Sequence, residues 1–342
     1  MERNPMRIDA ELANDIDLVA TSANHAEAAG YAGAWVGDTS HDPFLQIMQA
    51  AQATESITVG TSVAIAFARS PMTTAYSAYD LARYSRGRFV LGLGSQVKPH
   101  VERRFSMPWG SPAARMREYV LALKAIWESW QNGTKLDFRG EFYTHTLMTP
   151  FFSPESHQYG PPDVYVAGVN TAMTEAAGEV ADGFFTHPFT TRRYLEEVTL
   201  PALRRGRAKQ GGTLDDLVVA GPMFVTVGRT EEELAAAIAG TRDRIAFYGS
   251  TPVYRPVLEL HGWGDLQPEL HQLTKAGRWD ELGSLITDEI LHTFSVVGTP
   301  AEVGPALRKK LGHIFGRTSF YAPYDAEPSL LTELLAHVRD AA

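Results

Sequence analysis

The chain has 342 residues, 44% hydrophobic and 21% charged, values typical of a globular protein with a large core. Its formal net charge of −9 argues against a general nucleic-acid-binding surface, which would be basic. The sequence contains no cysteine, so disulfides, thiolate metal sites and cysteine nucleophiles are excluded.

Strand-like and helix-like segments alternate along the chain. The predicted strands lie within residues 6–12, 33–38, 57–67, 88–94, 163–169, 182–187, 216–228 and, as the last strand, 292–298. The predicted helices span about 15–29, 43–55, 71–85, 112–130, 171–181, 190–210 and 230–247, and a further helix begins at Thr299. Several helices open on a capping residue followed by proline, as at Asp42-Pro43 and Ser70-Pro71.

About eight strand–helix units of this kind match a (β/α)8 TIM barrel. An open doubly wound sheet gives a similar rhythm, but the alternation runs from end to end without a break, which favours the barrel. We therefore predict a single domain over residues 1–342. Residues 135–147 interrupt the alternation of strands and helices and are predicted to form a hairpin. Residues 328–342 are predicted to form one more helix. Residues of about 248–291 are rich in proline and glycine and are predicted to be an insertion between the seventh unit and the eighth strand.

The active site of such a barrel lies at the carboxyl ends of the strands. Asp38 ends a buried strand, where a carboxylate needs a partner, so it is a candidate site residue. His41 follows in the same loop and is a candidate general base, although a loop histidine can also be simply solvated. Asp42 is interpreted as a helix cap, and His100 and His187 are weaker candidates.

Two glycine-containing turns are candidate ligand sites. Gly92-Leu93-Gly94-Ser95 lacks the third glycine of a dinucleotide fingerprint and follows about the fourth strand. Its glycines either relieve crowding in a barrel strand or let a planar ligand approach the backbone. The turn at 167–171 either binds an anion such as phosphate at a helix start or is an ordinary turn capped by Asn170 or Thr171.

Basic residues gather after the third and fourth strands at Arg69, Lys98, Arg103 and Arg104, where they either attract an anionic ligand tail or form a solvated positive face. The histidines and carboxylates show no metal-ligand spacing, and the sequence has neither a G-x-S-x-G elbow nor a P-loop. No metal site is therefore predicted. Large loop aromatics, namely Trp109, Tyr254 and Trp263, either line a substrate pocket or serve packing alone.

Six strings, taken in order, resemble the luciferase-like monooxygenase superfamily, and within it the branch of oxidoreductases that use the deazaflavin coenzyme F420. They are GAWVGDTSHDPF, TVGTSVAIAFARSP, GRFVLGLGSQ, YVAGVN, VADGFFTHPF and GTPAEV, and the resemblance covers nearly the whole chain. The resemblance implies a TIM barrel with an insertion after the seventh strand, and a homodimer.

The resemblance also implies roles for particular residues. A cis non-proline peptide bond that supports the deazaflavin ring corresponds to Ser62-Val63, and the family's acidic residue after the second strand corresponds to Asp38. Its turn after the fourth strand matches Gly94 and Ser95, and its phosphate-binding turn matches Ala167, Gly168, Val169 and Asn170. Thr39 stands where some F420 dehydrogenases have a catalytic histidine, so alcohol dehydrogenase chemistry is not implied.

The resulting hypothesis is an F420-dependent oxidoreductase that transfers a hydride to or from an unidentified small organic substrate, with Asp38 and His41 as catalytic candidates. Two alternatives remain: an FMN-dependent monooxygenase that uses O2, and a barrel that binds a flavin without turnover. Residues 1–18 mix charges without an apolar signal-peptide core, and no run is long enough to cross a bilayer. A cytoplasmic protein with neither nucleic-acid nor membrane partners is therefore expected.

Overall fold

Parallel strands and the helices that follow them make up most of this computed structural model, which describes residues 6–341. The chain divides into two units. The central unit comprises residues 9–185 and 202–218, and the terminal unit comprises, among the described residues, 6–8, 186–201 and 219–341. Strands β1 (Arg7–Glu11) and β10 (Val218–Ala220) contribute residues to both units. The predicted α/β class is thus confirmed.

A parallel sheet forms the core of the central unit. Its strands are ordered β9-β8-β5-β3-β2-β1. Their bounds are Gly33–Val36 for β2, Thr58–Thr61 for β3, Phe89–Gly94 for β5, Asp163–Ala167 for β8 and Gly183–Phe185 for β9. A short strand β4 (Ala64–Ile65) also pairs with β5. Strands β2 and β5 are buried at every residue, as expected when helices cover a parallel sheet.

Three aromatic rings and the glycines beside them fill one layer of this unit. Trp35 meets Phe185 edge-on at 5.2 Å between ring centroids, and Tyr165 lies 5.4 Å from Phe185. A Cβ atom on Gly60 would lie 2.3 Å from the Trp35 ring, and one on Gly183 would lie 2.5 Å from the Tyr165 ring. Gly183 is therefore required by the volume of the Tyr165 ring, and Gly60 by the Trp35 ring together with the Val90 carbonyl oxygen, from which its Cβ would lie 2.6 Å.

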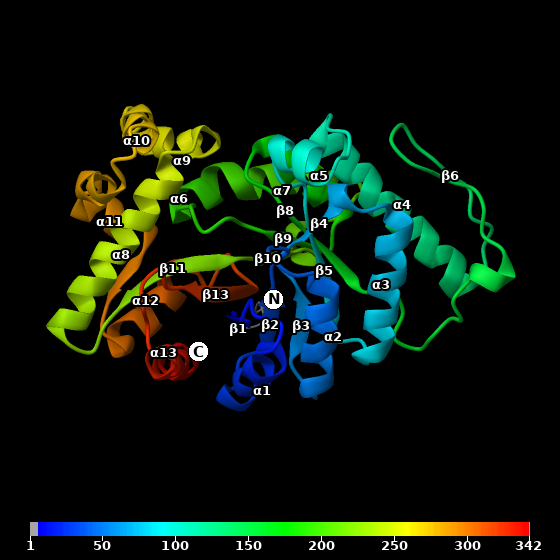
Figure 1. The fold of residues 1–342 in the computed structure, drawn as a ribbon, viewed down its shortest axis with the longest axis horizontal. Helices are drawn as coiled ribbons and strands as arrows, with labels where there is room; N and C mark the ends of the chain where they lie inside the picture. Colours follow the sequence, from blue (N-terminus) through cyan, green and yellow to red (C-terminus); the bar gives the residue numbers. More distant parts are fainter. Residues whose placement is uncertain (1–5, 342) are drawn as a thin grey trace. The chain divides into compact units, whose positions relative to one another are not determined.

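Helices of the central unit follow its strands in chain order (Figure 1). Their bounds are Val19–Ala29 for α1, Pro43–Ala53 for α2, Pro71–Tyr84 for α3, Pro112–Asn132 for α4 and Thr171–Val180 for α5. Sequential neighbours from α1 to α5 contact one another. The caps predicted at Asp42 and Ser70 are confirmed, because Asp42 accepts a hydrogen bond from the Phe44 N–H and Ser70 accepts one from the Thr73 N–H. The predicted start of the first helix at Asp15 is wrong, since α1 begins at Val19.

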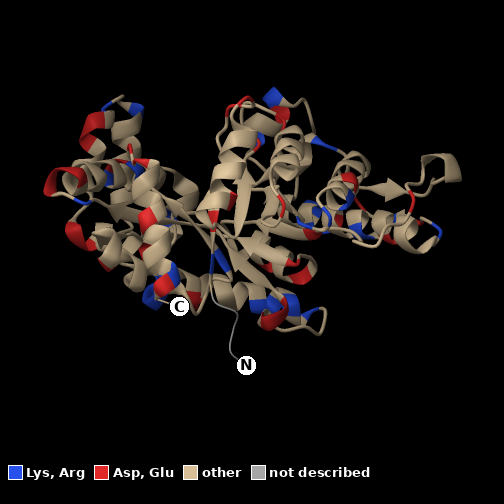
Figure 2. Ribbon diagram, turned by 90° about the horizontal axis from the view of Figure 1, so that it is seen from below, with Lys and Arg blue, Asp and Glu red and all other residues tan. Residues whose placement is uncertain are grey.

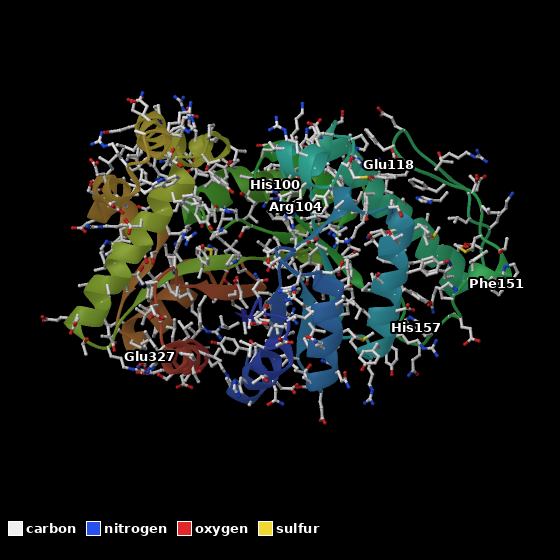
Figure 3. All side chains as sticks on the ribbon, in the orientation of Figure 1. His100, Arg104, Glu118, Phe151, His157 and Glu327 are labelled. Carbon is white, nitrogen blue, oxygen red and sulfur yellow. The ribbon has the colours of Figure 1, made fainter. Side chains whose placement is uncertain are left out.

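The predicted hairpin is present as β6 (Phe138–Arg139) paired antiparallel with β7 (Thr144–His145). A single carboxylate of α4 holds its turn: Glu118 accepts hydrogen bonds from the N–H groups of Glu141, Phe142 and Tyr143 at 2.6–2.8 Å. Figure 3 shows Glu118 on α4 beside this excursion, and Phe151 farther along it. The hairpin is therefore fixed to the helix and is not an independent arm.

The terminal unit contains the strand β11 (Pro222–Val227), which pairs in parallel with β12 (Val296–Gly298) and with β13 (Arg317–Tyr321). Strand β13 corrects the sequence analysis, which placed the last strand within residues 292–298. The segment has buried polar side chains at Arg317, Thr318 and Ser319. It therefore lacks the apolar signature by which a buried strand is recognised.

Helices surround this sheet in the terminal unit. They are α6 (Arg192–Tyr194), α8 (Glu231–Gly249), α11 (Asp288–Phe294), α12 (Pro300–Leu311) and α13 (Pro328–Asp340). Between the first two lies α7 (Leu200–Ala208), which begins in this unit and continues in the central one. Helix α13 begins where predicted, while its predicted last residue, Ala342, lies outside the described residues.

Residues 248–291 contain α9 (Arg255–Leu260), α10 (Leu266–Lys275) and the 3-10 segment η7 (Trp279–Leu285). They pack on α8 through buried side chains such as Val257, Leu270 and Leu282. Acidic and basic residues alternate over the helices in the view of Figure 2, in agreement with the mixed charge of the sequence. Among the described residues, no helix has the length and apolarity needed to cross a membrane.

Candidate functional site

A buried carboxylate, that of Asp38, lies two residues after strand β2. The side chain of Asp38 is 6% exposed, and its Oδ2 accepts hydrogen bonds from Arg69 Nη1 at 2.5 Å and from the Ile65 N–H at 3.0 Å. Arg69 Nη2 also donates to Asp42 at 3.0 Å. Burial alone would lower the pKa of Arg69, but the two carboxylates outweigh it and raise that pKa. Within the described chain, Asp38 Oδ1 has no hydrogen-bond donor, so it can accept one from a ligand.

The bond Ser62-Val63 is a cis peptide, as the family resemblance implies. Two backbone hydrogen bonds attach this bulge to the end of β2. The Ser62 N–H donates to the Val36 carbonyl at 2.7 Å, and the Asp38 N–H donates to the Val63 carbonyl at 3.1 Å. Ser62 and Val63 are both half-buried. The bulge and Asp38 thus form one backbone-linked surface at the carboxyl ends of β2 and β3.

The glycines of β5 are explained by close approach to that surface. A Cβ atom on Gly92 would lie 1.9 Å from the Thr61 carbonyl oxygen, so the crowding interpretation applies to Gly92. A Cβ atom on Gly94 would lie 2.5 Å from Val63 Cγ2. Gly94 therefore touches the bulge itself, and Ser95, half-buried, follows it directly. Glycine at position 94 lets β5 contact the surface that a planar ligand would use.

The turn after β8 is capped by Asn170, one of the two interpretations made from its sequence. Asn170 caps α5, because its Oδ1 accepts a hydrogen bond from the Met173 N–H at 2.9 Å. The Gly168 N–H donates to the Phe185 carbonyl at 3.4 Å. The N–H groups of residues 169–172 make no hydrogen bond within residues 6–341. Free N–H groups at the start of a helix are ready donors for an oxyanion.

The loop after β2 is held by residues that the sequence analysis did not assign to the site. Thr39 Oγ1 donates to Asn14 Oδ1 at 2.6 Å, and Arg104 Nη2 donates to the Thr39 carbonyl at 2.7 Å. Asn14 directly precedes the helix predicted over 15–29, and no local pattern indicates that its side chain reaches this loop. His41 is half-buried and has no hydrogen-bond partner in the described part of the chain, so nothing there fixes its tautomer.

The basic residues after the third and fourth predicted strands differ in their partners. Arg69 is paired with two carboxylates and Arg104 with a backbone carbonyl, so the prediction that Arg69 meets an acidic ligand tail has no support here. Lys98 is 62% exposed and lies 3.8 Å from Glu102. Figure 3 shows His100 and Arg104 on the same π-helical turn, η2 (His100–Arg104). Lys98, just before η2, and Arg103, within it, are both exposed.

Other candidates lie elsewhere. Trp109 belongs to the central unit, where its ring meets that of Phe67 at 6.0 Å, while His187, Tyr254 and Trp263 belong to the terminal unit. No group of three or more His, Asp or Glu side chains arranged to hold a metal ion occurs within residues 6–341.

The model of the luciferase-like monooxygenase family matches residues 2–313. The chain therefore belongs to the luciferase-like monooxygenase family. It is 51% identical over 312 residues to an uncharacterized protein of Mycobacterium tuberculosis, a match that covers 91% of this chain and 92% of that protein. It is 28% identical to 5,10-methylenetetrahydromethanopterin reductase of Archaeoglobus fulgidus, with 81% of each chain covered.

Solved structures show the same fold. The coenzyme F420 dependent tetrahydromethanopterin reductase from Methanopyrus kandleri superposes with a TM-score of 0.80 at 19% identity, covering 99% of this chain and 100% of that chain. Monooxygenases also occur among the structural neighbours. The α/β fold with its parallel sheet is thus that of luciferase-like proteins.

Proposed function

We propose that this protein is a coenzyme F420-dependent oxidoreductase that transfers a hydride between the deazaflavin and a small organic substrate. The observation that carries the proposal is the joined surface formed by the Ser62-Val63 bulge and Asp38, with one carboxylate oxygen left as an acceptor. Relatives and structural neighbours named as F420-dependent enzymes support the same cofactor.

The residues present fit such a cofactor. Ser62, Val63, Gly94 and Ser95 would support its ring, and Asp38 Oδ1 would accept a hydrogen bond from a ring N–H. The turn formed by Ala167, Gly168, Val169 and Asn170 would bind its phosphate through the free N–H groups before α5. When bound, the deazaflavin supplies the hydride chemistry, and the protein supplies placement and electrostatics.

Two side chains are proposed to act at the reacting atoms. Asp38 is paired with Arg69 and is proposed to orient hydrogen-bond donors around the ring. His41 is the nearest titratable group along the loop after Asp38 and is proposed to hold or release the substrate proton. We further propose a complete (β/α)8 barrel over residues 1–342, with residues of about 248–291 inserted between the seventh unit and the eighth strand. The protein is proposed to be a cytoplasmic homodimer.

An FMN-dependent monooxygenase that uses O2 is the second candidate, because monooxygenases occur among the structural neighbours. It predicts tight FMN binding and indifference to F420. A barrel that binds a flavin without turnover is distinguished by cofactor binding in the absence of any substrate oxidation or reduction.

A fluorescence titration of the full-length protein with F420 and, separately, with FMN tests the proposal. Saturable quenching of F420 with a weak FMN response is the expected result, and tight FMN binding without F420 binding would overturn it. Gly94→Ala should weaken F420 binding about tenfold or more, because its Cβ would meet Val63 at 2.5 Å. Gly110→Ala is the matched control, since its Cβ would meet nothing within 4 Å.

A further inference from the structure

The terminal unit contains a group of aromatic and hydrogen-bonding side chains near the carboxyl end of β13. Tyr321 is the last residue of β13, and His187 lies two residues after β9, the last residue of which ends the first segment of the central unit. Tyr248 lies near the end of α8, and Tyr254 ends the 3-10 turn η6 (Pro252–Tyr254). We call these four residues the His–Tyr cluster. In α/β barrels, ligands bind at the carboxyl ends of the strands, which makes this cluster a candidate binding site.

The rings of the cluster contact one another directly. His187 stacks on Tyr254, with ring centroids 4.5 Å apart and planes inclined by 26°. It meets Tyr248 edge-on at 4.7 Å. The hydroxyl groups of Tyr248 and Tyr321 lie 2.8 Å apart and share a hydrogen bond. All four side chains are half-buried, so the cluster is accessible yet ordered by packing.

His187 presents a hydrogen-bond donor from this cluster. Its Nδ1 accepts a hydrogen bond from the Phe189 N–H at 3.0 Å, so the proton of the neutral ring resides on Nε2. Burial lowers the pKa of His187 to about 4, which keeps the ring neutral at pH 7. Neither His187 Nε2 nor the Tyr254 hydroxyl forms a hydrogen bond within the described residues. Both groups are thus available to a ligand.

An arginine without a counter-ion adjoins the cluster. The Arg244 guanidinium lies 5.9 Å from the Tyr248 ring centroid and 5.7 Å from that of Phe247. It is half-buried and forms neither an ion pair nor a hydrogen bond in the part of the chain that the structure describes. Arg242 of the same helix, by contrast, is paired with Asp288. A partly buried guanidinium that lacks a partner favours an external anion, and its planar fork matches a carboxylate.

We propose that the His–Tyr cluster and Arg244 form a binding site for the carboxylate of a small planar organic acid. The aromatic rings would contact the body of the ligand, while Arg244, His187 Nε2 and the Tyr254 hydroxyl would supply donors to its oxygens. None of these five side chains carries a negative charge that would repel the ligand. The identification of this acid as the substrate class of the enzyme rests on the proposed function.

Calorimetric titration of the full-length protein with benzoate, and with benzamide as an uncharged probe of the same shape, tests the site. Benzoate should bind at least tenfold more tightly than benzamide. Arg244→Met should weaken benzoate binding at least tenfold, and His187→Phe, which keeps a stacked ring but removes the donor, several-fold. Arg242→Met should leave benzoate binding unchanged, because that arginine already has a partner.

Equal affinities for the two probes, or absence of benzoate binding at millimolar concentrations, would overturn the proposal. Arg244→Lys is a second variant, which keeps the positive charge but loses the planar fork of the guanidinium. The test of the carboxylate site therefore does not depend on whether Arg244→Met folds correctly. These titrations need no cofactor. Benzoate binding without F420 binding would refute the proposed function alone, and F420 binding without benzoate binding would refute the carboxylate site alone.

Discussion

At the scale of single residues, Asp38 and Arg69 form an ion pair at the carboxyl end of β2 in the central unit. The arginine holds one oxygen of the carboxylate and shares its remaining donors with Asp42 and the Ile65 carbonyl. The other oxygen of Asp38 stays available. Removal of the negative charge of Asp38 should therefore lower the affinity for a ligand more than the stability of the fold, because Arg69 keeps Asp42 as a second carboxylate partner.

Asp38→Asn should lower the affinity for F420 about tenfold, since a hydrogen bond to a charged group contributes about 1.5–3 kcal/mol. The measurement is a fluorescence titration of the variant. Asp42→Asn is the control: it removes the charge of the other partner of Arg69, keeps a side-chain oxygen for the α2 cap, and leaves Asp38 intact. Equal losses in the two variants would contradict a specific role for Asp38.

Asp38 could be named as a candidate site residue from the sequence alone, because a carboxylate at the end of a buried strand needs a partner. Its partner Arg69 lies 31 residues farther on, so that pairing depends on strand order and not on local pattern. The cis bond at Ser62-Val63 was expected from the family resemblance only. Arg244 was not predicted, since an unpaired arginine is recognised only when its neighbours are placed.

At the scale of secondary-structure elements, one glutamate of α1 anchors the segment that leads into β3. Glu27 accepts hydrogen bonds from the backbone N–H groups of Glu55, Ser56 and Ile57, and from the Ser56 hydroxyl. Burial would raise the pKa of Glu27, but these hydrogen bonds together lower it to about 2. The carboxylate thus connects α1 to the segment between α2 and β3.

Glu27→Gln should lower the melting temperature at pH 7, because several N–H groups lose a charged acceptor, each worth about 1 kcal/mol. The folded pKa lies below the ordinary value of 4.5, so this stabilisation is present above pH 4.5 and is lost as the pH falls toward 2. Thermal melts at pH 7 and pH 3 should therefore show a smaller difference between variant and wild type at pH 3. Glu55→Gln, an exposed neighbour, serves as the control.

Elements with local signals could be predicted, and those without them could not. Helices α2 and α3 were predicted with their caps because Asp42 and Ser70 act within their own turns. Strand β13 was missed because buried polar residues conceal its pattern. The predicted helix over 190–210 contains a π-helical segment, η4 (Leu195–Thr199), between α6 and α7, and such a change of helix type has no sequence signature here.

At the scale of the whole molecule, the charge balance opposes an acidic cofactor. A net charge of −9 repels such a ligand at long range, so attraction must come from local cations. Lys98 and Arg103 are exposed beside the turn after β5, whereas Arg69 is already neutralised. The proposed F420 site therefore depends on a small number of surface charges.

Lys98→Glu should weaken F420 binding about two- to fivefold at low ionic strength, as expected for a single exposed charge. The difference in F420 affinity between the variant and the wild type should vanish at about 0.5 M salt, because the salt then screens charges that are more than a few ångströms apart. Titrations at the two salt concentrations measure it, and Lys275→Glu on α10 is the control. An equal effect of Lys98→Glu on FMN, which lacks the acidic tail, would argue against this assignment.

The layer of rings and glycines in the central unit limits which amino-acid substitutions this part of the chain can accept during evolution. The atoms nearest to a Cβ atom on Gly183 would all belong to the Tyr165 ring, whereas a Cβ atom on Gly60 would also lie 2.6 Å from the Val90 carbonyl oxygen. Enlarging Gly183 therefore requires a smaller residue at position 165 in the same step, and shrinking that ring leaves a cavity that a second substitution can fill. Substitutions at these facing positions are therefore expected to occur in pairs that keep the total side-chain volume constant. The way in which that volume is shared between the two strands can change.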